Sequence, residues 1–189
     1  MSSIIKIQGL TKQYGNILAV DHLDLEVFEG EIFGLLGPNG AGKTTTIRML
    51  TGQTTPTSGS ATVTNYDIIH EPTKAKQHIG VIPDISNIYD EMSAWDNLIF
   101  AAQLYSVPKI EREKKAKELL ELFGLYERRK DRLAGFSKGM KRRLTIAAAL
   151  IHKPKLLFLD EPTSGLDVQS LRMIRTLIKE LNNEQRVPP

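Results

Sequence analysis

The amino-acid sequence predicts an α/β fold that begins with antiparallel strands and contains an inserted, mainly helical segment. Residues Ala19–Phe28 alternate between apolar and mostly acidic side chains, which is the pattern of a half-buried strand. Two short and wholly apolar runs, Ile79–Ile82 and Leu156–Leu159, have the length of buried strands. Between residues 84 and 151 the apolar side chains instead recur at helical spacing. This order predicts a β-rich lobe, an α/β core, a helical lobe and a return to the core.

The first part of the chain predicts short strands joined by turns. An isoleucine-rich strand is expected before the turn at Gly15–Asn16. A further strand, Glu31–Leu36, is expected to lead into a glycine-rich loop, and a helix follows from Gly42 to about Leu50. Residues 51–60, TGQTTPTSGS, have the composition of a loop because Pro and Gly lie among small polar residues.

Two helices are expected early in the inserted segment and one near the end of the chain. Ser93 and Asp96 resemble a capping box that begins a helix continuing to Tyr105. Lys109–Phe123 has apolar residues on one helical face and charged residues on the other, which is most simply a solvated surface. Val168–Leu181 predicts a closing amphipathic helix.

The composition is that of a globular protein and excludes several classes of site. The chain has 189 residues, of which 41% are hydrophobic and 25% charged, with a formal net charge of +3. There are no cysteines, which excludes disulfides and cysteine-based zinc sites. No signal peptide is recognisable, and apolar runs such as Ile146–Ile151 are too short to span a bilayer. Any membrane role is therefore expected to come through a partner.

The glycine-rich loop has the pattern of a phosphate-binding loop. Gly37–Thr44 reads GPNGAGKT, which fits G-x-x-x-x-G-K-[ST]. Glycines let backbone N–H groups close around phosphates, and the N-terminus of the following helix adds positive potential. Lys43 is expected to reach the β- and γ-phosphates, and the Thr44 hydroxyl to ligate Mg²⁺. The pattern predicts a P-loop NTPase whose nucleotide contacts come from Gly37, Pro38, Asn39, Gly40, Ala41, Gly42, Lys43, Thr44 and Thr45.

Two adjacent acids follow the apolar run Leu156–Leu159. Taken alone, Asp160 and Glu161 are most simply solvated side chains at the end of a strand. A P-loop NTPase requires acids of this kind, which favours a functional interpretation. Asp160 is expected to hold Mg²⁺, directly or through water, and Glu161 to polarise the attacking water as the general base. Glu161 and Lys43 are thus the predicted catalytic residues.

With these motifs in place, the sequence resembles the ATP-binding subunits of ABC transporters over almost its whole length. Tyr14 lies where family members stack an aromatic ring on adenine. Phe136–Met140 reads FSKGM at the position of the family's signature loop LSGGQ, and Ser137 and Gly139 match it. Pro162–Asp167 reads PTSGLD, as in the family's D-loop. The resemblance implies that Ser137 and Gly139 contact ATP held by a second subunit. Ser137 also suits a plain helix N-cap, and both roles can hold.

The chain departs from the family pattern in two places. Asp84 stands where the family has the Q-loop glutamine, so a contact of Asp84 with Mg²⁺ is an open expectation. No histidine follows Asp167, whereas family members carry a switch histidine after a further strand. The chain is therefore expected to be truncated, to bind ATP and to hydrolyse it slowly. His152 is expected to be an ordinary surface residue before the last core strand.

The resemblance implies the fold, domains and partners of an ABC-type ATPase. Residues 1–83 and 152–189 are expected to form the antiparallel β lobe and the nucleotide-binding core, and residues 84–151 the helical lobe with the signature loop. Residues 81–98 and Met140 resemble the exporters of the drug, sodium and polysaccharide branch, which are ABC-2-like. The implied cofactors are ATP and Mg²⁺. The implied partners are a transmembrane permease subunit and a second ATPase subunit, at the cytoplasmic face of the cell membrane.

Three alternatives remain at this point. The first is a soluble ABC ATPase of DNA repair or translation, although the chain has neither a long coiled-coil insert nor a second cassette. The second is a nucleotide-binding module with little hydrolysis. The third is nucleic-acid binding by the basic cluster of Lys138, Lys141, Arg142 and Arg143, which we do not expect because no aromatic residues are interleaved with it.

Overall fold

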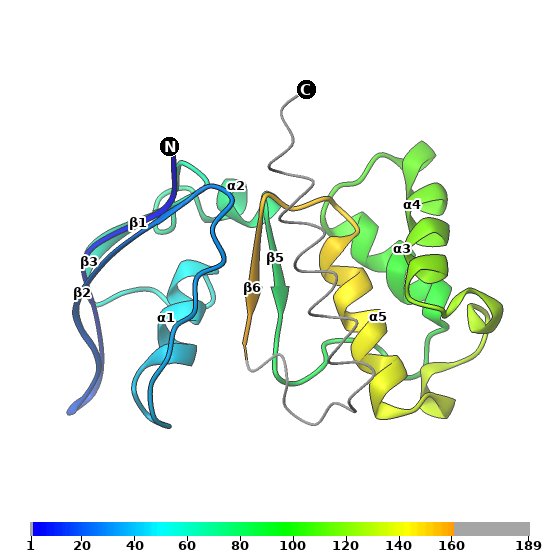
Figure 1. Ribbon diagram of the computed structural model, residues 1–189, viewed down its shortest axis with the longest axis horizontal. Coiled ribbons are helices and arrows are strands. Elements are labelled where there is room, and N and C mark those ends of the chain that lie inside the picture. The colour runs from blue at the N-terminus through cyan, green and yellow to red at the C-terminus, as the bar shows by residue number, and fades with distance from the viewer. Residues whose placement is uncertain (1, 161–189) are drawn as a thin grey trace. The chain divides into compact units, whose positions relative to one another are not determined.

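The computed structural model describes residues 2–160 of the chain. These residues form two compact units, which are described one at a time: residues 2–79 and residues 80–160. Figure 1 labels the helices α1 to α5 and the strands β1, β2, β3, β5 and β6.

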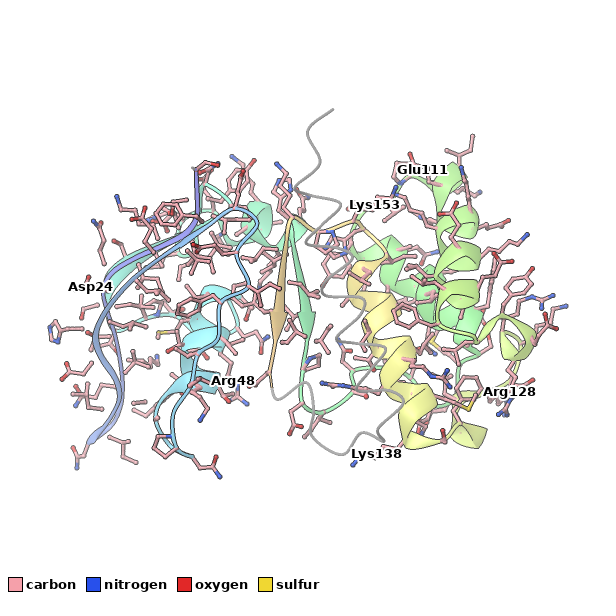
Figure 2. The ribbon with its side chains drawn as sticks, viewed as in Figure 1. Asp24, Arg48, Glu111, Arg128, Lys138 and Lys153 are labelled. Atoms are coloured by element: carbon pink, nitrogen blue, oxygen red, sulfur yellow. The ribbon has the colours of Figure 1, made fainter. Side chains whose placement is uncertain are left out.

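The first unit is built on an antiparallel sheet in the strand order β2-β1-β3-β4. β1 (Ser3–Tyr14) and β2 (Ile17–Phe28) form a long hairpin around the turn at Gly15–Asn16, as the sequence predicts. β3 (Ser58–Val63) pairs with the other edge of β1, and β4 (Tyr66–Asp67) pairs with β3. The registers of β1 with β2 and with β3 shift near Gly9, whose N–H donates to the Asp24 carboxylate at 2.7 Å (Asp24 is labelled in Figure 2).

Two helices complete the first unit. α1 (Lys43–Leu50) confirms the helix expected after the glycine-rich loop, and Met49 and Leu50 at its end are buried. α2 (Pro72–Gln77) follows β4 and begins with proline, which is favourable at the first helical position because its missing N–H is not needed there. Its Lys74 forms an ion pair with Glu71 at 2.8 Å.

Two expectations for the first unit were wrong. Residues 31–36 carry no strand, because a strand requires a hydrogen-bonded neighbour and none of the described residues pairs with this segment. Ile32, Phe33 and Leu36 are accordingly exposed. Residues 58–60, expected in a loop, begin β3 because β1 offers them an unpaired edge. Only Ala61 and Val63 of β3 are buried, so its sequence shows little apolar alternation.

A pair of neighbouring strands belongs mainly to the second unit, since β5 begins at the last described residue of the first. β5 (Ile79–Ile82) and β6 (Leu156–Leu159) are hydrogen-bonded neighbours, and both confirm predicted strands. The Asp160 N–H, just after β6, donates to the Ile82 carbonyl at the end of β5 at 3.0 Å. The carboxyl ends of the two strands therefore lie together, as in a parallel pair.

Helices form the rest of the second unit. α3 (Ala94–Leu104), α4 (Lys109–Leu122) and α5 (Lys138–Leu150) pack around a core that includes Leu98, Leu120 and Leu144. Two 3-10 turns, η1 (Tyr126–Arg128) and η2 (Leu133–Gly135), connect α4 to α5. The backbone N–H of the half-buried Trp95 donates to the Arg129 carbonyl oxygen at 2.9 Å and holds the start of α3 to this connection.

The predicted helix starts in this unit are confirmed, and one surface assignment was wrong. The Ser93 hydroxyl accepts a hydrogen bond from the Asp96 N–H and caps α3, as its sequence pattern predicts. His152 is not an ordinary surface residue: it is half-buried, and its ring stacks on Tyr105 with 3.8 Å between the ring centroids. This stacking removes the surface of both rings from water. The sequence does not reveal it, because Tyr105 and His152 are far apart along the chain.

Candidate functional site

The glycine-rich loop of the first unit leads directly into the N-terminus of α1. Gly42 is the N-cap residue and has φ 83, a left-handed conformation that favours glycine. A Cβ at this position would lie 2.4 Å from the Ala19 carbonyl oxygen, so a side chain cannot fit. The first turn of α1 contains no acidic residue, and no side chain caps it. Its N–H groups and the helix dipole therefore form a setting suited to an anion.

Lys43 lies over the same loop. Its ammonium group donates to the carbonyl oxygens of Gly37 and Pro38 at 2.8 and 2.7 Å. The Ala41 N–H donates to Pro38 O at 3.2 Å, which closes the loop into a turn. Thr44 and Thr45 are half-buried in the first turn of α1. The Lys43 ammonium group and the turn therefore lie together at the start of α1.

The predicted aromatic residue lies in the same unit as the loop. Tyr14 ends β1, pairs with Ile17 across the hairpin turn, and is 46% exposed. The close approach of Ala19 to Gly42 places this end of the hairpin beside the start of α1. The structure therefore brings Tyr14 and the loop to one region of the first unit. The sequence analysis did not identify this contact of Ala19. The only indication in the sequence is a glycine at position 42, which lets the backbone of Ala19 come close.

The two predicted acids of the second unit lie at one end of its strand pair. Asp160 follows β6, and its N–H is bonded to Ile82 O; Asp84 follows β5 by way of Pro83. The carboxyl ends of neighbouring parallel strands are where ligands of α/β proteins collect. Glu161 and Pro162–Asp167 lie outside the described residues.

The residues expected to hold magnesium have suitable chemistry for it. Thr44 belongs to the first unit, and Asp84 and Asp160 belong to the second. Hydroxyl and carboxylate oxygens are the hard ligands that Mg²⁺ prefers. Within residues 2–160, no three His, Cys, Asp or Glu side chains gather as a self-sufficient metal site.

Ser137 caps α5, so the structural role considered for it is confirmed. Its hydroxyl accepts a hydrogen bond from the Met140 N–H at 3.2 Å, and the first turn of α5 contains no acidic residue. Lys138 and Gly139 lie in that turn (Lys138 is labelled in Figure 2). The start of α5 therefore brings together a hydroxyl group, the backbone N–H groups at the positive end of a helix dipole, and the cation of Lys138.

The rest of the basic cluster is used inside the protein. Arg142 is 5% exposed and donates to the carbonyl oxygens of Pro83 and Asp84. Burial lowers the pKa of Arg142 from its ordinary value, and the nearby Asp84 carboxylate partly offsets this. Arg143 donates to Phe123 O at 3.1 Å. These contacts tie Arg142 and Arg143 to backbone carbonyl oxygens of their own unit.

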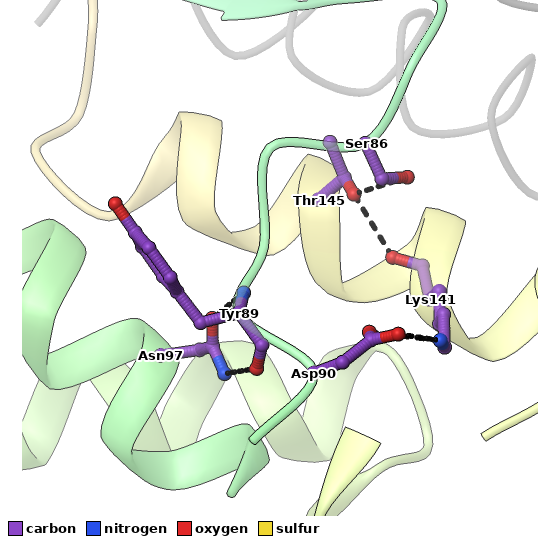
Figure 3. Close-up of polar contacts among 6 residues, drawn as sticks. All are labelled: Ser86, Tyr89, Asp90, Asn97, Lys141 and Thr145. Carbon is purple, nitrogen blue, oxygen red and sulfur yellow. Dashed lines mark hydrogen bonds and ion pairs between the residues drawn. The ribbon is translucent and has the colours of Figure 1, made fainter. Parts of the chain in front are cut away.

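The segment after β5, residues 83–90, is fastened to α5 and α3 by polar side chains. Figure 3 shows the contacts: Lys141 forms an ion pair with Asp90 at 2.6 Å, and the Thr145 hydroxyl donates to the Ser86 hydroxyl at 3.0 Å. The buried Asn97 accepts from the Tyr89 N–H at 2.8 Å and donates to Tyr89 O at 3.0 Å. Asp84 is therefore held to the helix that carries Ser137.

Comparison with known proteins gives one consistent result. The family model for ABC transporters matches residues 20–164. The linearmycin resistance ATP-binding protein of Bacillus subtilis is 46% identical over 95% of this chain and 58% of its own length. The bacitracin transport ATP-binding protein of Bacillus licheniformis is 43% identical over 99% of this chain and 60% of its own. The chain thus spans less than two thirds of the length of these relatives.

A relative of more similar length and a solved structure agree. The ABC transporter ATP-binding protein NatA of Bacillus subtilis is 39% identical over 90% of this chain and 70% of its own length. A structure described as the ATP binding subunit of an ABC transporter superposes with a TM-score of 0.86 and 29% identity over 96% of this chain and 75% of its own. No helix among residues 2–160 is long and apolar enough for a membrane span. With the glycine-rich loop, the capped α5 and the acids after β5 and β6 in place, the family match over most of the sequence shows that this chain belongs to the ABC transporter family.

Proposed function

We propose that this chain binds Mg-ATP through the loop at the start of α1. Two adjacent residues carry the proposal. Gly42 has no room for a side chain, and the Lys43 ammonium group lies against the carbonyl oxygens of the loop. Phosphates would take the N–H groups of residues 37–45, and adenine would stack on Tyr14. Thr44 and Asp160 would hold Mg²⁺, and Asp84 is a further candidate ligand.

The same proposal includes hydrolysis. Glu161 follows the proposed metal ligand Asp160 in the sequence and is our candidate for the general base that orients the attacking water. Lys43 would stabilise the charge that develops on the transferred phosphoryl group. Ser137 and Gly139, at the start of α5, would contact the γ-phosphate of ATP held by a second copy or a related subunit. Two subunits would then share two nucleotides.

The proposed biological role is to power transport through a membrane permease, in the direction of export. The supporting observation is that relatives with 39–46% identity are named for transport or for drug resistance. A Nod factor export ATP-binding protein of Cupriavidus metallidurans is 41% identical over 96% of this chain. The chain would act at the inner face of the cell membrane, attached through the permease.

The binding step is tested by calorimetry with Mg-ATP on the 189-residue chain. The Lys43→Ala variant should lose tight binding, because it removes the cation expected to face the β- and γ-phosphates. Lys6→Ala is the matched control, since Lys6 is an exposed lysine on β1 of the same unit. Equal ATP affinity of Lys43→Ala and the unaltered protein would overturn the assignment of this loop.

A further inference from the structure

A second side chain lies against the ring of Tyr14. The Lys12 ammonium group is 4.9 Å from the centroid of the Tyr14 ring. The two residues are two positions apart on β1, so their side chains leave the strand on the same side. Tyr14 is 46% exposed, whereas Lys12 is half-buried. The cation therefore covers part of the ring, and a large part stays open to solvent.

Lys12 is itself held in place by the loop before β3. Its ammonium group donates to the Thr55 carbonyl at 2.7 Å. The Thr57 hydroxyl accepts from the Gln13 N–H at 3.0 Å, so this loop runs along the end of β1. The loop is also tied to α1, because the N–H groups of Gln53 and Thr54 donate to Arg48 O at 2.8 and 3.1 Å (Arg48 is labelled in Figure 2).

These contacts form a continuous path from α1 to the aromatic ring. α1 begins at the phosphate-binding loop, and Arg48 in its last turn holds the loop that holds Lys12. The start of α1 is in turn close to the same end of the hairpin, because Ala19 lies against Gly42. The ring of Tyr14 is thus positioned relative to α1 from two directions.

We propose that Lys12 is a positioning residue for the nucleotide base: it supports one face of the Tyr14 ring and leaves the opposite face for adenine. The proposal rests on the proposed function, because it concerns the base of the same nucleotide. A cation over one face attracts the π electrons of the ring and lowers the freedom of the ring to turn. A base that stacks on the opposite face then meets a ring already oriented for it, which favours binding because less order is lost.

The test compares Mg-ATP with inorganic tripolyphosphate on the 189-residue chain. Lys12→Met keeps an unbranched, flexible side chain of nearly the same length and removes its charge. We expect it to weaken ATP binding by about threefold to tenfold, the range of a cation–π contact and the ordering it provides. Binding of tripolyphosphate, which has no base, should stay unchanged. Lys12→Arg should retain the ATP affinity, and Lys6→Met, on the same strand, should be neutral for both ligands.

A double-variant cycle with Tyr14 shows whether Lys12 acts through the ring. In a Tyr14→Ala background, Lys12→Met should change ATP affinity by less than about twofold, because no ring remains to support. An equal loss of affinity for ATP and tripolyphosphate, or an undiminished loss in the Tyr14→Ala background, would overturn the proposal.

The outcome also separates this proposal from the proposed function. If Lys43→Ala abolishes binding while Lys12→Met binds ATP as the unaltered chain does, nucleotide binding stands and the role of Lys12 falls. If the unaltered chain binds neither ATP nor tripolyphosphate, both fall together.

Discussion

At the scale of single residues, Gly42 shows how a sequence motif becomes a geometric requirement. The motif places glycine there, but only the structure shows what excludes a larger residue: the Ala19 carbonyl oxygen, 2.4 Å from where a Cβ would lie. The backbone fixes both the carbonyl oxygen and the direction in which a Cβ would leave Gly42, so no side-chain rotation can relieve the clash. The positive φ of 83 adds a second cost for any side chain.

Gly42→Ala should therefore damage the fold and the site together. The hairpin and the start of α1 would have to separate, and we expect a loss of about 2 kcal/mol or more in the free energy of unfolding, typical of a strained substitution. Urea denaturation followed by circular dichroism measures this loss. Ala41→Gly is a useful comparison, because Ala41 is an exposed neighbour in the same loop. A Gly42→Ala protein as stable as the parent would show that the hairpin can shift at no cost.

Glu161→Gln should separate binding from chemistry. The amide keeps the shape of the side chain but cannot accept a proton, so hydrolysis should fall by about 10² or more while Mg-ATP binding is retained. Phosphate release measures the first quantity and calorimetry the second. The control is Glu29→Gln, an acid between β2 and residues 31–36. Hydrolysis by Glu161→Gln at the parental rate would place the base elsewhere.

At the scale of elements, the segment from residue 83 to 90 depends on one buried amide. Asn97 is 4% exposed and makes three hydrogen bonds: one from Tyr89 N–H, one to Tyr89 O and one to Ser93 O at 2.9 Å. No apolar side chain can supply these partners. The segment that carries Asp84 is thus fixed to the start of α3 as well as to α5.

Asn97→Ala should destabilise the second unit. It leaves polar backbone groups of Tyr89 without their partner, and each such group costs about 1–3 kcal/mol when buried. A drop in the free energy of unfolding of this size is expected in urea. Asn87→Ala, an exposed amide in the same segment, should change stability by less than about 0.5 kcal/mol. Equal stability of the two variants would contradict the role given to Asn97.

The elements that the sequence predicts well are those with local signals. The hairpin β1–β2, the capped helix α3 and the apolar strands β5 and β6 carry periodicity, turn residues or a cap in their own residues. β3 was missed because its burial is limited to Ala61 and Val63, and its stability comes from pairing with a strand far away in the sequence. The expected strand at residues 31–36 has the reverse problem: apolar residues but no partner among residues 2–160.

The candidate site divides in the same way. Motifs locate Lys43, Ser137 and Asp160, because phosphate chemistry restricts the residue types and their spacing. No sequence pattern marks the supporting contacts, such as that of Lys12 with Tyr14 or of Arg142 with Pro83. They depend on which segments meet after folding, and neither periodicity nor composition records that.

At the scale of the whole molecule, each unit of the described chain has buried apolar residues of its own. Leu10, Met49 and Val63 are fully buried in the first unit, and Leu98, Leu120 and Leu144 in the second. The expected nucleotide contacts are divided between the units: the loop and Tyr14 lie in one, and Asp84, Asp160 and Ser137 in the other. Under the proposed function, Ser137 acts on the nucleotide of another subunit, so assembly should depend on ATP.

This dependence is measurable by sedimentation. Glu161→Gln with Mg-ATP should shift from monomer to dimer, because bound ATP that is not hydrolysed keeps both surfaces in contact. The double variant Glu161→Gln with Lys43→Ala should remain monomeric at the same concentration, because it no longer holds the nucleotide. A dimer that forms equally well without ATP would contradict the shared nucleotide site.

The position of Trp95 means that tryptophan fluorescence reports on the second unit and not on the first. It is the single tryptophan of the chain, and it is anchored in the second unit by the bond from its N–H to Arg129 O. That bond is made by the backbone N–H, and the fluorescent indole ring is carried by α3. The emission of the ring therefore responds to the environment of α3 and its neighbours. The strands β1–β3 contain no tryptophan and contribute mainly to the far-ultraviolet circular dichroism. Unfolding confined to residues 2–79 would thus change the dichroism while the tryptophan emission stays constant.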